Sequence, residues 1–358
     1  MMSSSVVDVA RRNSYRVYEF FRDRPEEQWT VADVALATQL SVPTVARACE
    51  RHEHAGWLSS EVTPIAPVGR PPRSYRYLAA GHGVLAIDAF EDVALRLSDL
   101  AGRTVTEVIV SGADGDRPEL LAGRLTQLLD GSGSVRRRVH AVAVAVPDDG
   151  AAGPGEDLAR EARAVLLREG IDKALPGVKA SVFPGGRWAA LTAAREDGLS
   201  GIDLGVYIHG EGTSLSTLVV SGRVYHGVQG RAGDFRAVST LTGRLPGAQD
   251  DLEELFPAGA EAGLAGGLAA SELLASSIVA AYDPEAVVLS DSVSDRTANA
   301  LRQLAQMRGG SPRVIRSRWD RRGAVLRGCV LGAIDSADDY SLVTELSSGT
   351  AEAGLSRA

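Results

Sequence analysis

The sequence predicts a small helical domain at the N-terminus, followed by a larger α/β domain. Two observations carry this prediction. Apolar residues recur at helical spacing through residues 1–60, whereas strand-like apolar runs alternate with Ala-rich helical stretches from Gly83 onward. Six apolar runs are predicted as strands, at 84–90, 105–110, 139–146, 204–210, 216–222 and 286–291, and helices are predicted at 118–130, 157–168, 187–197 and 266–282. A segment rich in Pro, Gly and Arg, residues 61–80, separates the two patterns. With 358 residues the chain is long enough for two or three domains.

The composition excludes several classes of protein. Hydrophobic residues make up 44% of the chain and charged residues 23%, as in ordinary globular domains. The formal net charge of −8 gives no overall positive field, so any contact with nucleic acid has to come from a local patch. Cys49 and Cys329 are too few and too distant for a disulfide framework or a cysteine-rich zinc site. Without a long apolar run or a signal-peptide core, we expect a cytoplasmic protein that contacts no membrane.

Residues 14–56 are typical of three helices with a tight turn before the third. Apolar residues form one stripe over 14–23, and Thr30 is a suitable N-cap for a helix over 31–39. Ser41 is a suitable N-cap for the next helix, which tolerates Pro43 in its first turn and ends at Gly56. A helix, a short turn and a second helix are what a reader of the DNA major groove requires.

The third helix is predicted to present a polar stripe to solvent. Thr44, Arg47 and Arg51 lie three and four residues apart, on a different face from the apolar Val45, Ala48 and Cys49. Side chains of this kind can hydrogen-bond to base edges and phosphates.

A two-stranded ribbon is predicted after the third helix. Residues 57–58 and 75–78 have strand character and bracket a loop with Arg70 and Arg73, with Arg76 beside it. No acidic residue occurs between Glu61 and Asp88, so this ribbon is locally positive although the chain is acidic. Its arginines are expected to contact phosphates or the minor groove. The alternative is a three-helix module that binds protein and carries an arginine-rich loop.

The order of motifs along the chain resembles the ROK family of repressors and sugar kinases, in particular its winged-helix regulators. LSVPTVARACERHEHAGWL resembles the recognition-helix segment, and GRPPRSYRYLA resembles the wing. Further along, GVLAIDAFEDVALRLSDLAGRTV, AVAVAVPDDG, SGRVYHGVQGRAGDF and AAYDPEAVVLSD resemble, in order, four motifs of the larger domain. The similarity spans roughly residues 11–335.

The resemblance implies an α/β protein with an N-terminal winged helix-turn-helix and a two-lobed actin- and hexokinase-like domain. The winged helix is expected at 1–80 and the ROK-like domain at 81–345. Lobe one would comprise about 81–183 plus 321–345, and lobe two about 184–320. Residues 346–358 would form a flexible tail.

The resemblance does not extend to the phosphate-binding motifs of the kinases. Those enzymes hold ATP phosphates on an Asp-x-Gly-Gly-Thr turn, whereas Asp88 is followed here by Ala-Phe-Glu-Asp. The carboxylates of Glu91 and Asp92 would repel phosphate oxygens. Glu211 likewise interrupts the second turn, which is Gly-Thr-Gly in the family.

The catalytic base and the zinc ligands of the family are also missing. Gly185 and Gly186 stand where the family has its Asn-Asp pair, and glycine cannot accept the proton of a sugar hydroxyl. Ala237 stands at the position of the zinc-binding histidine, and no cysteine occurs between 50 and 328. We therefore expect no enzymatic activity, no metal and no cofactor.

Some ligand-contacting positions are retained or replaced in a way that could bind another small molecule. Asp234 aligns with the glutamate of the Ala-Gly-Glu motif, and Glu253 with the glutamate after the zinc cysteines. The other candidates are Arg187, Trp188, His209 and Glu211. Each has an ordinary alternative: the acids as solvated loop residues, and Trp188 as a core residue.

The sequence thus predicts a DNA-binding transcriptional regulator, a repressor, that acts on an operator as a homodimer or tetramer. Its DNA-contacting residues are expected to be Ser41, Pro43, Thr44, Arg47, Arg51, Arg70, Arg73 and Arg76. The ROK-like domain would dimerise and sense an effector, with a sugar or sugar derivative as the candidate. Two alternatives remain: a sugar kinase with an added DNA-binding domain, and a regulator whose second domain is a scaffold that binds no ligand.

Overall fold

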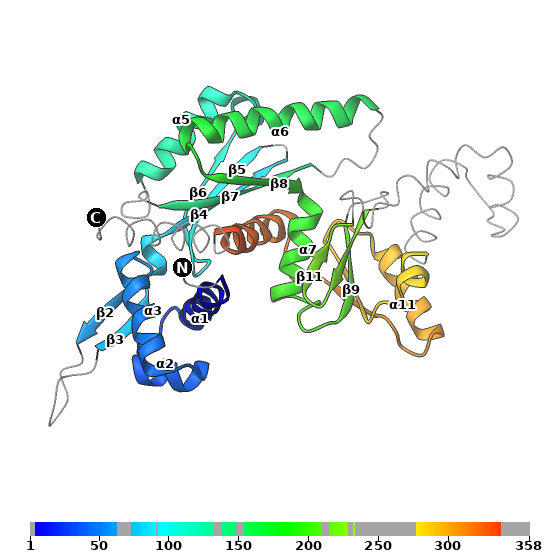
Figure 1. Ribbon diagram of the computed structural model, residues 1–358. Helices are drawn as coiled ribbons and strands as arrows, with labels where there is room; N and C mark the ends of the chain where they lie inside the picture. Colours follow the sequence, from blue (N-terminus) through cyan, green and yellow to red (C-terminus); the bar gives the residue numbers. More distant parts are fainter. Residues whose placement is uncertain are drawn as a thin grey trace, which may run out of the picture.

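The structure is a computed structural model. It describes residues 4–62, 73–90, 92–131, 138–147, 154–209, 215–227, 232 and 277–337. Along these ranges the chain forms a helical domain with a small sheet, followed by two five-stranded sheets with their helices (Figure 1). The α/β architecture predicted from the sequence is therefore confirmed.

The N-terminal domain is a winged helix-turn-helix. It contains α1 (Ser4–Arg22), α2 (Val31–Thr38) and α3 (Val42–His54), together with a three-stranded sheet in the order β1-β3-β2. The strands are β1 (Trp29–Thr30), β2 (Leu58–Val62) and β3 (Arg73–Tyr77), and all pairs are antiparallel. The apolar stripes predicted from the sequence meet in its core, which includes Val17, Tyr18, Phe21, Val34, Val45 and Trp57.

Two N-caps fix the turn between α2 and α3. Thr30 accepts a hydrogen bond from the Asp33 N–H, and the Asp33 carboxylate accepts one from the Thr30 N–H, which is a capping box. Helix α2 ends at Gln39, whose φ of 55° reverses the chain, and Ser41 then caps α3. The turn therefore comprises residues 39–41, and α2 ends one residue before the end of the helix predicted over 31–39.

The first lobe is built on a mixed sheet in the order β6-β5-β4-β7-β8. Its strands are β4 (Gly83–Ala89), β5 (Val93–Asp99), β6 (Thr104–Val110), β7 (Val139–Val146) and β8 (Lys179–Pro184). Strands β4, β5 and β6 form antiparallel pairs, whereas β7 and β8 are added in parallel. Helices α5 (Pro118–Gly131) and α6 (Pro154–Ala174) cover one face, and the short α4 (Gly112–Gly115) precedes them (Figure 1).

The second lobe repeats the topology of the first. Its sheet has the order β11-β10-β9-β12-β13, with two antiparallel pairs followed by two parallel ones. The strands are β9 (Leu204–His209), β10 (Leu215–Val220), β11 (Arg223–Tyr225), β12 (Ala286–Leu289) and β13 (Arg313–Arg316). Helices α7 (Gly185–Glu196) and α11 (Asp295–Met307) belong to this part, and residues 277–282 are helical. Numbered from the first strand of each sheet, both lobes follow the order 3-2-1-4-5.

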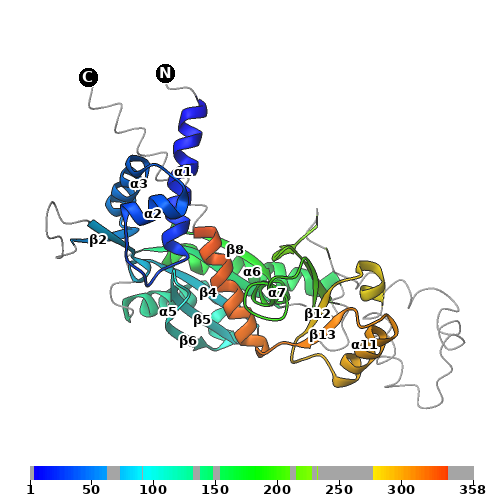
Figure 2. The same cartoon turned by 90° about the horizontal axis from the view of Figure 1, so that it is seen from below.

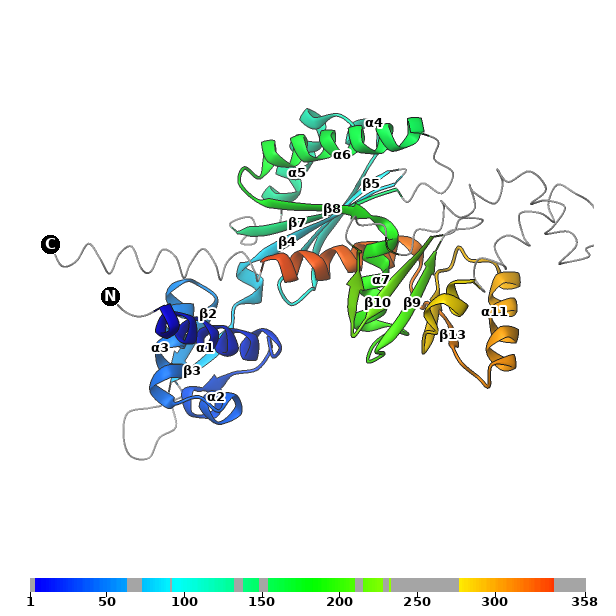
Figure 3. The same ribbon diagram turned by 45° about the vertical axis from the view of Figure 1, so that its right-hand side comes forward.

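The last described helix, residues 321–337, returns from the second lobe to the first. Figure 2 shows it running along the first sheet from the side of β13 toward the N-terminal domain, and Figure 3 shows it beside α7. Gly328 and Gly332 permit a close crossing, because a Cβ at Gly328 would lie 1.8 Å from the Trp188 carbonyl oxygen. The Thr192 hydroxyl donates to the Ala324 carbonyl at 2.7 Å at the same crossing.

Most of the remaining secondary-structure predictions fall within the described residues, and some do not. The six apolar runs predicted as strands all contain strands, and the helices predicted at 118–130, 157–168 and 187–197 are present. Of the helix predicted at 266–282, only 277–282 lies in the described ranges, and the tail at 346–358 lies outside them. None of the helices in the described part of the chain is both long and apolar enough to cross a membrane.

Candidate functional site

The outward face of α3 carries the residues predicted to read DNA. Ser41, Pro43, Arg47 and Arg51 are exposed, and Thr44 is half-buried. The Arg51 Nε–H donates to the Arg47 carbonyl at 3.3 Å, one turn back along the helix. The Arg47 side chain, whose guanidinium has five N–H donors, has no bond to any residue in the described ranges.

The two hydroxyls at the start of α3 are bonded to each other. The Ser41 and Thr44 hydroxyl oxygens lie 2.8 Å apart, and Ser41 also accepts from the Thr44 N–H at 3.4 Å. The Thr44 N–H, which has no acceptor within the helix, thus finds one in the Ser41 side chain, as is usual at an N-cap. Both residues therefore have a structural role at the tip of the helix.

The wing is attached to the C-terminal end of α3 through Glu53. This carboxylate accepts from the Ser60 hydroxyl at 2.5 Å and pairs with the Arg73 guanidinium at 3.5 Å. Arg73 is still about half exposed, and Arg76, three residues further along β3 and on its other face, is exposed. Arg70 lies outside the described residues. Of the predicted wing arginines, Arg76 is the one whose side chain has no bond within the described ranges.

Helix α1 holds the recognition helix and the wing together. His52, on the inner face of α3, lies 3.1 Å from both the hydroxyl and the carbonyl oxygen of Ser14. Burial lowers the pKa of His52 from 6.5 to about 4, so the ring is neutral at physiological pH. The hydroxyl groups of Tyr18 and Tyr77 bond at 3.0 Å and join α1 to β3.

A cluster of rings joins the winged helix to the first lobe. The Trp57 ring stacks on His82 with centroids 4.2 Å apart, and His82 bonds to the His140 ring at 2.7 Å. His82 also bonds to the Gly56 carbonyl at 2.8 Å, and the Arg138 guanidinium donates to the Ala55 carbonyl at 2.7 Å. The end of α3 is therefore bonded directly to the start of β7.

The turn after β4, where the kinases of the resembled family bind phosphate, is occupied by the protein itself. Asp88 is buried and pairs with Arg321, whose guanidinium also lies 3.7 Å from the centroid of the Phe90 ring. The Arg321 backbone N–H donates to the Asp291 carboxylate, and Asp92 accepts from the Gly112 N–H. Glu91 lies outside the described residues. The sequence predicted carboxylate repulsion at this turn and did not predict the arginine that occupies it.

The two glycines that replace the catalytic Asn-Asp pair are buried at the start of α7. The His209 ring lies directly over Gly186, because a Cβ added there would be 1.9 Å from a ring carbon. No side chain of any kind fits at position 186 unless His209 moves. The arrangement around Gly185 and Gly186 thus excludes a carboxylate at this place in the present structure.

The neighbouring aromatic residues pack against one another. Trp188 is 6% exposed and donates its Nε1–H to the Val144 carbonyl at 3.0 Å, so it is a core residue and offers no face to a ligand. Phe183 packs on Trp188 and stacks on the His226 ring with centroids 5.3 Å apart. The half-buried Arg187 lies over the same Phe183 ring at 5.9 Å. Of the residues predicted to contact a ligand here, the structure brings Arg187, Trp188 and His209 close to one another on α7 and β9.

The other predicted ligand-binding residues, Glu211, Asp234 and Glu253, lie outside the described residues, as does Ala237. Among the residues that are described, no group of three His, Cys, Asp or Glu side chains is placed to hold a metal ion. Cys49 and Cys329 are both buried, free thiols.

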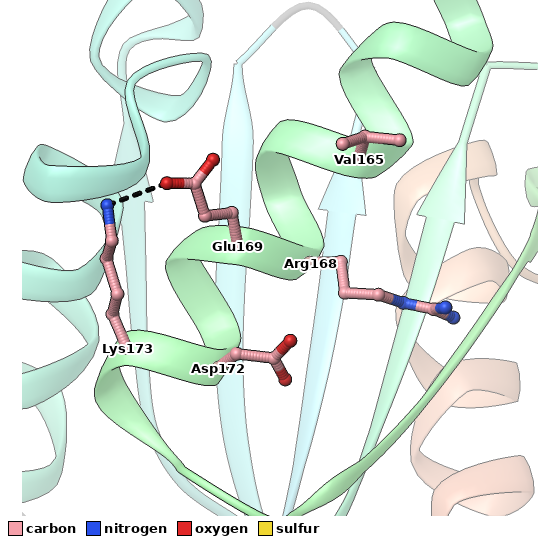
Figure 4. Close-up of a pocket in the computed structure, with 5 residues that line it drawn as sticks. All are labelled: Val165, Arg168, Glu169, Asp172 and Lys173. Carbon is pink, nitrogen blue, oxygen red and sulfur yellow. Dashed lines mark hydrogen bonds and ion pairs between the residues drawn. The ribbon is translucent and has the colours of Figure 1, made fainter.

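A shallow depression of about 480 Å³ lies on α6, away from all these residues. Its lining residues all belong to that helix: Val165, Arg168, Glu169, Asp172 and Lys173 (Figure 4). Lys173 bonds to Glu169 and to Glu119, each at 2.8 Å. Among the lining residues, the charges of the two acids, Glu169 and Asp172, balance those of the two bases, Arg168 and Lys173. The depression has neither convergent polar groups nor a net charge, so it does not have the character of a ligand site.

Several residues that define these sites were missed in the sequence. Arg321, Arg138 and the pair His82–His140 act across separations of 58 to 233 residues. Residue spacing in the sequence does not predict such contacts, because each of these residues bonds to a partner in another element.

Comparison with known proteins gives the class of the fold. The chain has a winged helix followed by a two-lobed, actin- and hexokinase-like domain. A solved structure with a similar fold is a ROK family transcriptional regulator, a homologue of the E. coli MLC protein. It is 16% identical, with a TM-score of 0.60, and the match covers 94% of this chain and 99% of that one. The fold agrees with the ROK resemblance seen in the sequence.

Two kinases match over a smaller share of this chain. A ROK hexokinase from Thermus thermophilus is 20% identical with a TM-score of 0.46, covering 72% of this chain and 99% of that one. A putative N-acetylmannosamine kinase from Listeria monocytogenes is 16% identical with a TM-score of 0.47, covering 71% and 99%. No protein-family model and no curated protein matches the chain.

Proposed function

We propose that the protein is a sequence-specific DNA-binding transcriptional regulator, and that it represses transcription from an operator in the cytoplasm. The observation that carries the proposal is the pair of exposed guanidinium groups, Arg47 and Arg51, on α3, a helix that is fixed between α1 and the wing by His52 and Glu53. A rigid helix of this kind can enter the major groove while the wing contacts the backbone. The fold shared with a ROK family transcriptional regulator supports the same conclusion.

The DNA-contacting set would be the α3 residues Pro43, Thr44, Arg47 and Arg51 with their N-cap Ser41, and the wing arginines Arg70, Arg73 and Arg76. Arg47 would read a base edge, and Arg76 would contact a phosphate. A single helix with a few phosphate contacts gives modest affinity, so we propose a homodimer or tetramer that presents two helices to successive turns of DNA.

The larger domain would serve assembly and sensing without catalysis. Two observations support this proposal: Asp88 pairs with Arg321 at the turn after β4, and a Cβ at Gly186 would meet the His209 ring. An effector, for which a sugar or sugar derivative is the candidate, would act by favouring one arrangement of the lobes. The ring cluster at His82 and His140 would transmit that change to α3.

The rival function is that of a sugar kinase with an added DNA-binding domain. Sugar-dependent release of ADP by the purified full-length chain would support this rival, provided that a cleft substitution such as Asp88→Asn abolished it. We expect no turnover above that of a buffer control. A second rival, a scaffold that binds no ligand, predicts that no sugar or sugar phosphate changes DNA binding or protein melting.

The central experiment is fluorescence anisotropy of the full-length chain on duplexes that it selects from a random library, against scrambled duplexes, over a salt series. We expect the selected duplex to bind at least about a thousandfold more tightly than the scrambled one. Equal, steeply salt-dependent binding to both duplexes would contradict the proposal, because it would reduce the interaction to nonspecific charge attraction.

A further inference from the structure

The N-terminal tip of α3 presents carbon atoms to solvent, although the rest of its outward face is polar. Val42, the first residue of the helix, is 52% exposed, and the neighbouring Pro43 is also exposed. An apolar side chain of this size is unusual at the end of a helix that faces water on this side. Isolated surface valines are common, so exposure alone decides nothing.

What distinguishes this tip is that most of its polar groups are already engaged, the exception among the described residues being the Val42 N–H. The Thr44 and Val45 N–H groups both donate to the Ser41 carbonyl, at 2.9 and 3.0 Å. Pro43 has no N–H to offer, and the Ser41 and Thr44 hydroxyls bond to each other at 2.8 Å. The first turn therefore meets any partner chiefly with the methyl groups of Val42 and the ring of Pro43.

In the major groove, one base feature matches an apolar tip. Thymine carries a C5-methyl group there, whereas the other base edges present hydrogen-bond donors and acceptors. Resting on the proposed function, we propose that Val42, with Pro43 beside it, contacts a thymine methyl group. The binding site would then carry a T·A pair opposite the start of α3.

The position of Arg47 supports this assignment and extends it. Pro43 and Arg47 are four residues apart and so lie on the same face of α3, one turn from each other. The recognition helix of a helix-turn-helix contacts base edges through its N-terminal residues. A methyl contact at the tip followed by a guanidinium one turn on would read a thymine and a nearby guanine.

The test uses the full-length chain and a duplex that it has selected from a random library. Each thymine of that duplex is replaced by uracil, one position at a time, and the Kd is measured by fluorescence anisotropy. Uracil pairs like thymine and lacks only the methyl group. We expect one thymine, or one symmetry-related pair, at which the substitution weakens binding about fourfold for each methyl lost.

The matched protein variant is Val42→Ala. Alanine is a better helix former than valine, and the side chain it replaces is exposed, so the helix is kept. We expect Val42→Ala to remove most of the difference between thymine and uracil at that position, leaving less than about a twofold ratio. Val165→Ala, at an exposed valine on α6 in the other domain, should leave the ratio unchanged.

The outcomes separate this proposal from the function on which it rests. If no duplex is preferred over a scrambled one, both are overturned, and the apolar tip then belongs to a protein interface. If a duplex is preferred but no thymine is sensitive to uracil, or if Val42→Ala keeps the full ratio, DNA recognition stands and the role of Val42 is overturned.

Discussion

The Arg321 guanidinium lies 3.1 Å from the carboxylate of Asp88, a residue that is only 2% exposed. Asp88 is the last residue but one of the buried strand β4, and Arg321 begins the helix that returns from the second lobe. The same guanidinium covers the ring of Phe90. One arginine thus joins the two ends of the larger domain at the turn where a kinase would hold phosphate.

The first prediction concerns the stability of this contact. Arg321→Ala should lower the free energy of unfolding by about 1–3 kcal/mol, because a buried carboxylate loses a charged partner. Arg322→Ala is the matched control, since the neighbouring arginine has no side-chain bond to any described residue. Urea unfolding of both variants gives the comparison.

A double-mutant cycle would show whether the effect belongs to the pair. Asp88→Asn removes the charge that Arg321 compensates, so the Arg321→Ala change should matter less in that background. Equal losses from Arg321→Ala in both backgrounds would mean that the arginine side chain acts through its contact with Phe90 instead.

The second prediction separates base contacts from phosphate contacts. Arg47→Ala should weaken binding by about 1–3 kcal/mol, selectively at one base position, and flatten the preference there. Arg76→Ala should weaken binding to all duplexes alike and lower the salt slope by about one unit. Anisotropy on the selected duplex and its single-base variants, at several salt concentrations, distinguishes the two patterns.

Arg73→Ala should resemble Arg76→Ala in its DNA-binding effect, with an added effect on the fold. Its guanidinium pairs with Glu53 on α3, so its removal also loosens the base of the wing. A uniform loss from Arg47→Ala, by contrast, would place Arg47 on a phosphate.

The third prediction is a loss of stability in mild acid. The folded-state pKa of His52 is about 4 and the ordinary value is 6.5, so the unfolded chain takes up the proton first as the pH falls. The stabilisation is complete above pH 6.5 and is lost between pH 6.5 and 4. It is limited to about 3 kcal/mol for this residue.

His52→Gln is the variant that checks this assignment. It removes the titrating group, so the difference in unfolding free energy between pH 7.5 and pH 5 should be smaller than in the unsubstituted chain. An unchanged difference would assign the acid sensitivity to other groups, among them His82 and His140, whose pKa values are also lowered by burial.

The fourth prediction uses two glycines as a matched pair. Gly328→Ala should destabilise the protein by about 1–3 kcal/mol, because its Cβ would lie 1.8 Å from the Trp188 carbonyl oxygen. Gly123→Ala, in α5, meets nothing within 4 Å and should stabilise the protein by up to about 1 kcal/mol. Thermal melts of the two variants should therefore shift in opposite directions.

The winged helix was accessible from the sequence because its signals are local. The caps at Thr30 and Ser41, the apolar stripes and the two short strands all lie within a few residues of the structures that they specify. These local signals do not, however, reveal which contacts each side chain makes. The sequence could not show that the hydroxyls of Ser41 and Thr44 bond to each other, or that Arg73 pairs with Glu53.

The alternation of strands and helices in the larger domain could be predicted from the sequence pattern. Its division into two lobes could be predicted only from the resemblance to the ROK family. The repeated strand order of the two sheets leaves no sequence period, because topology constrains which strands pair and not which residues fill them. The contact between Asp88 and Arg321 joins residues 233 positions apart, and Gly186 meets a histidine from another strand. Such contacts become visible only when the chain is folded.

The return of residues 321–337 to the first lobe has a consequence for synthesis. Chains emerge from the ribosome N-terminus first, at roughly 5–20 residues per second. The first sheet is therefore complete, and α7 is present, well before the helix that crosses Trp188 is made. A nascent chain, or one truncated before Arg321, exposes that apolar surface together with an Asp88 that lacks its arginine. Premature termination before Arg321 should therefore yield aggregating chains with an intact winged helix.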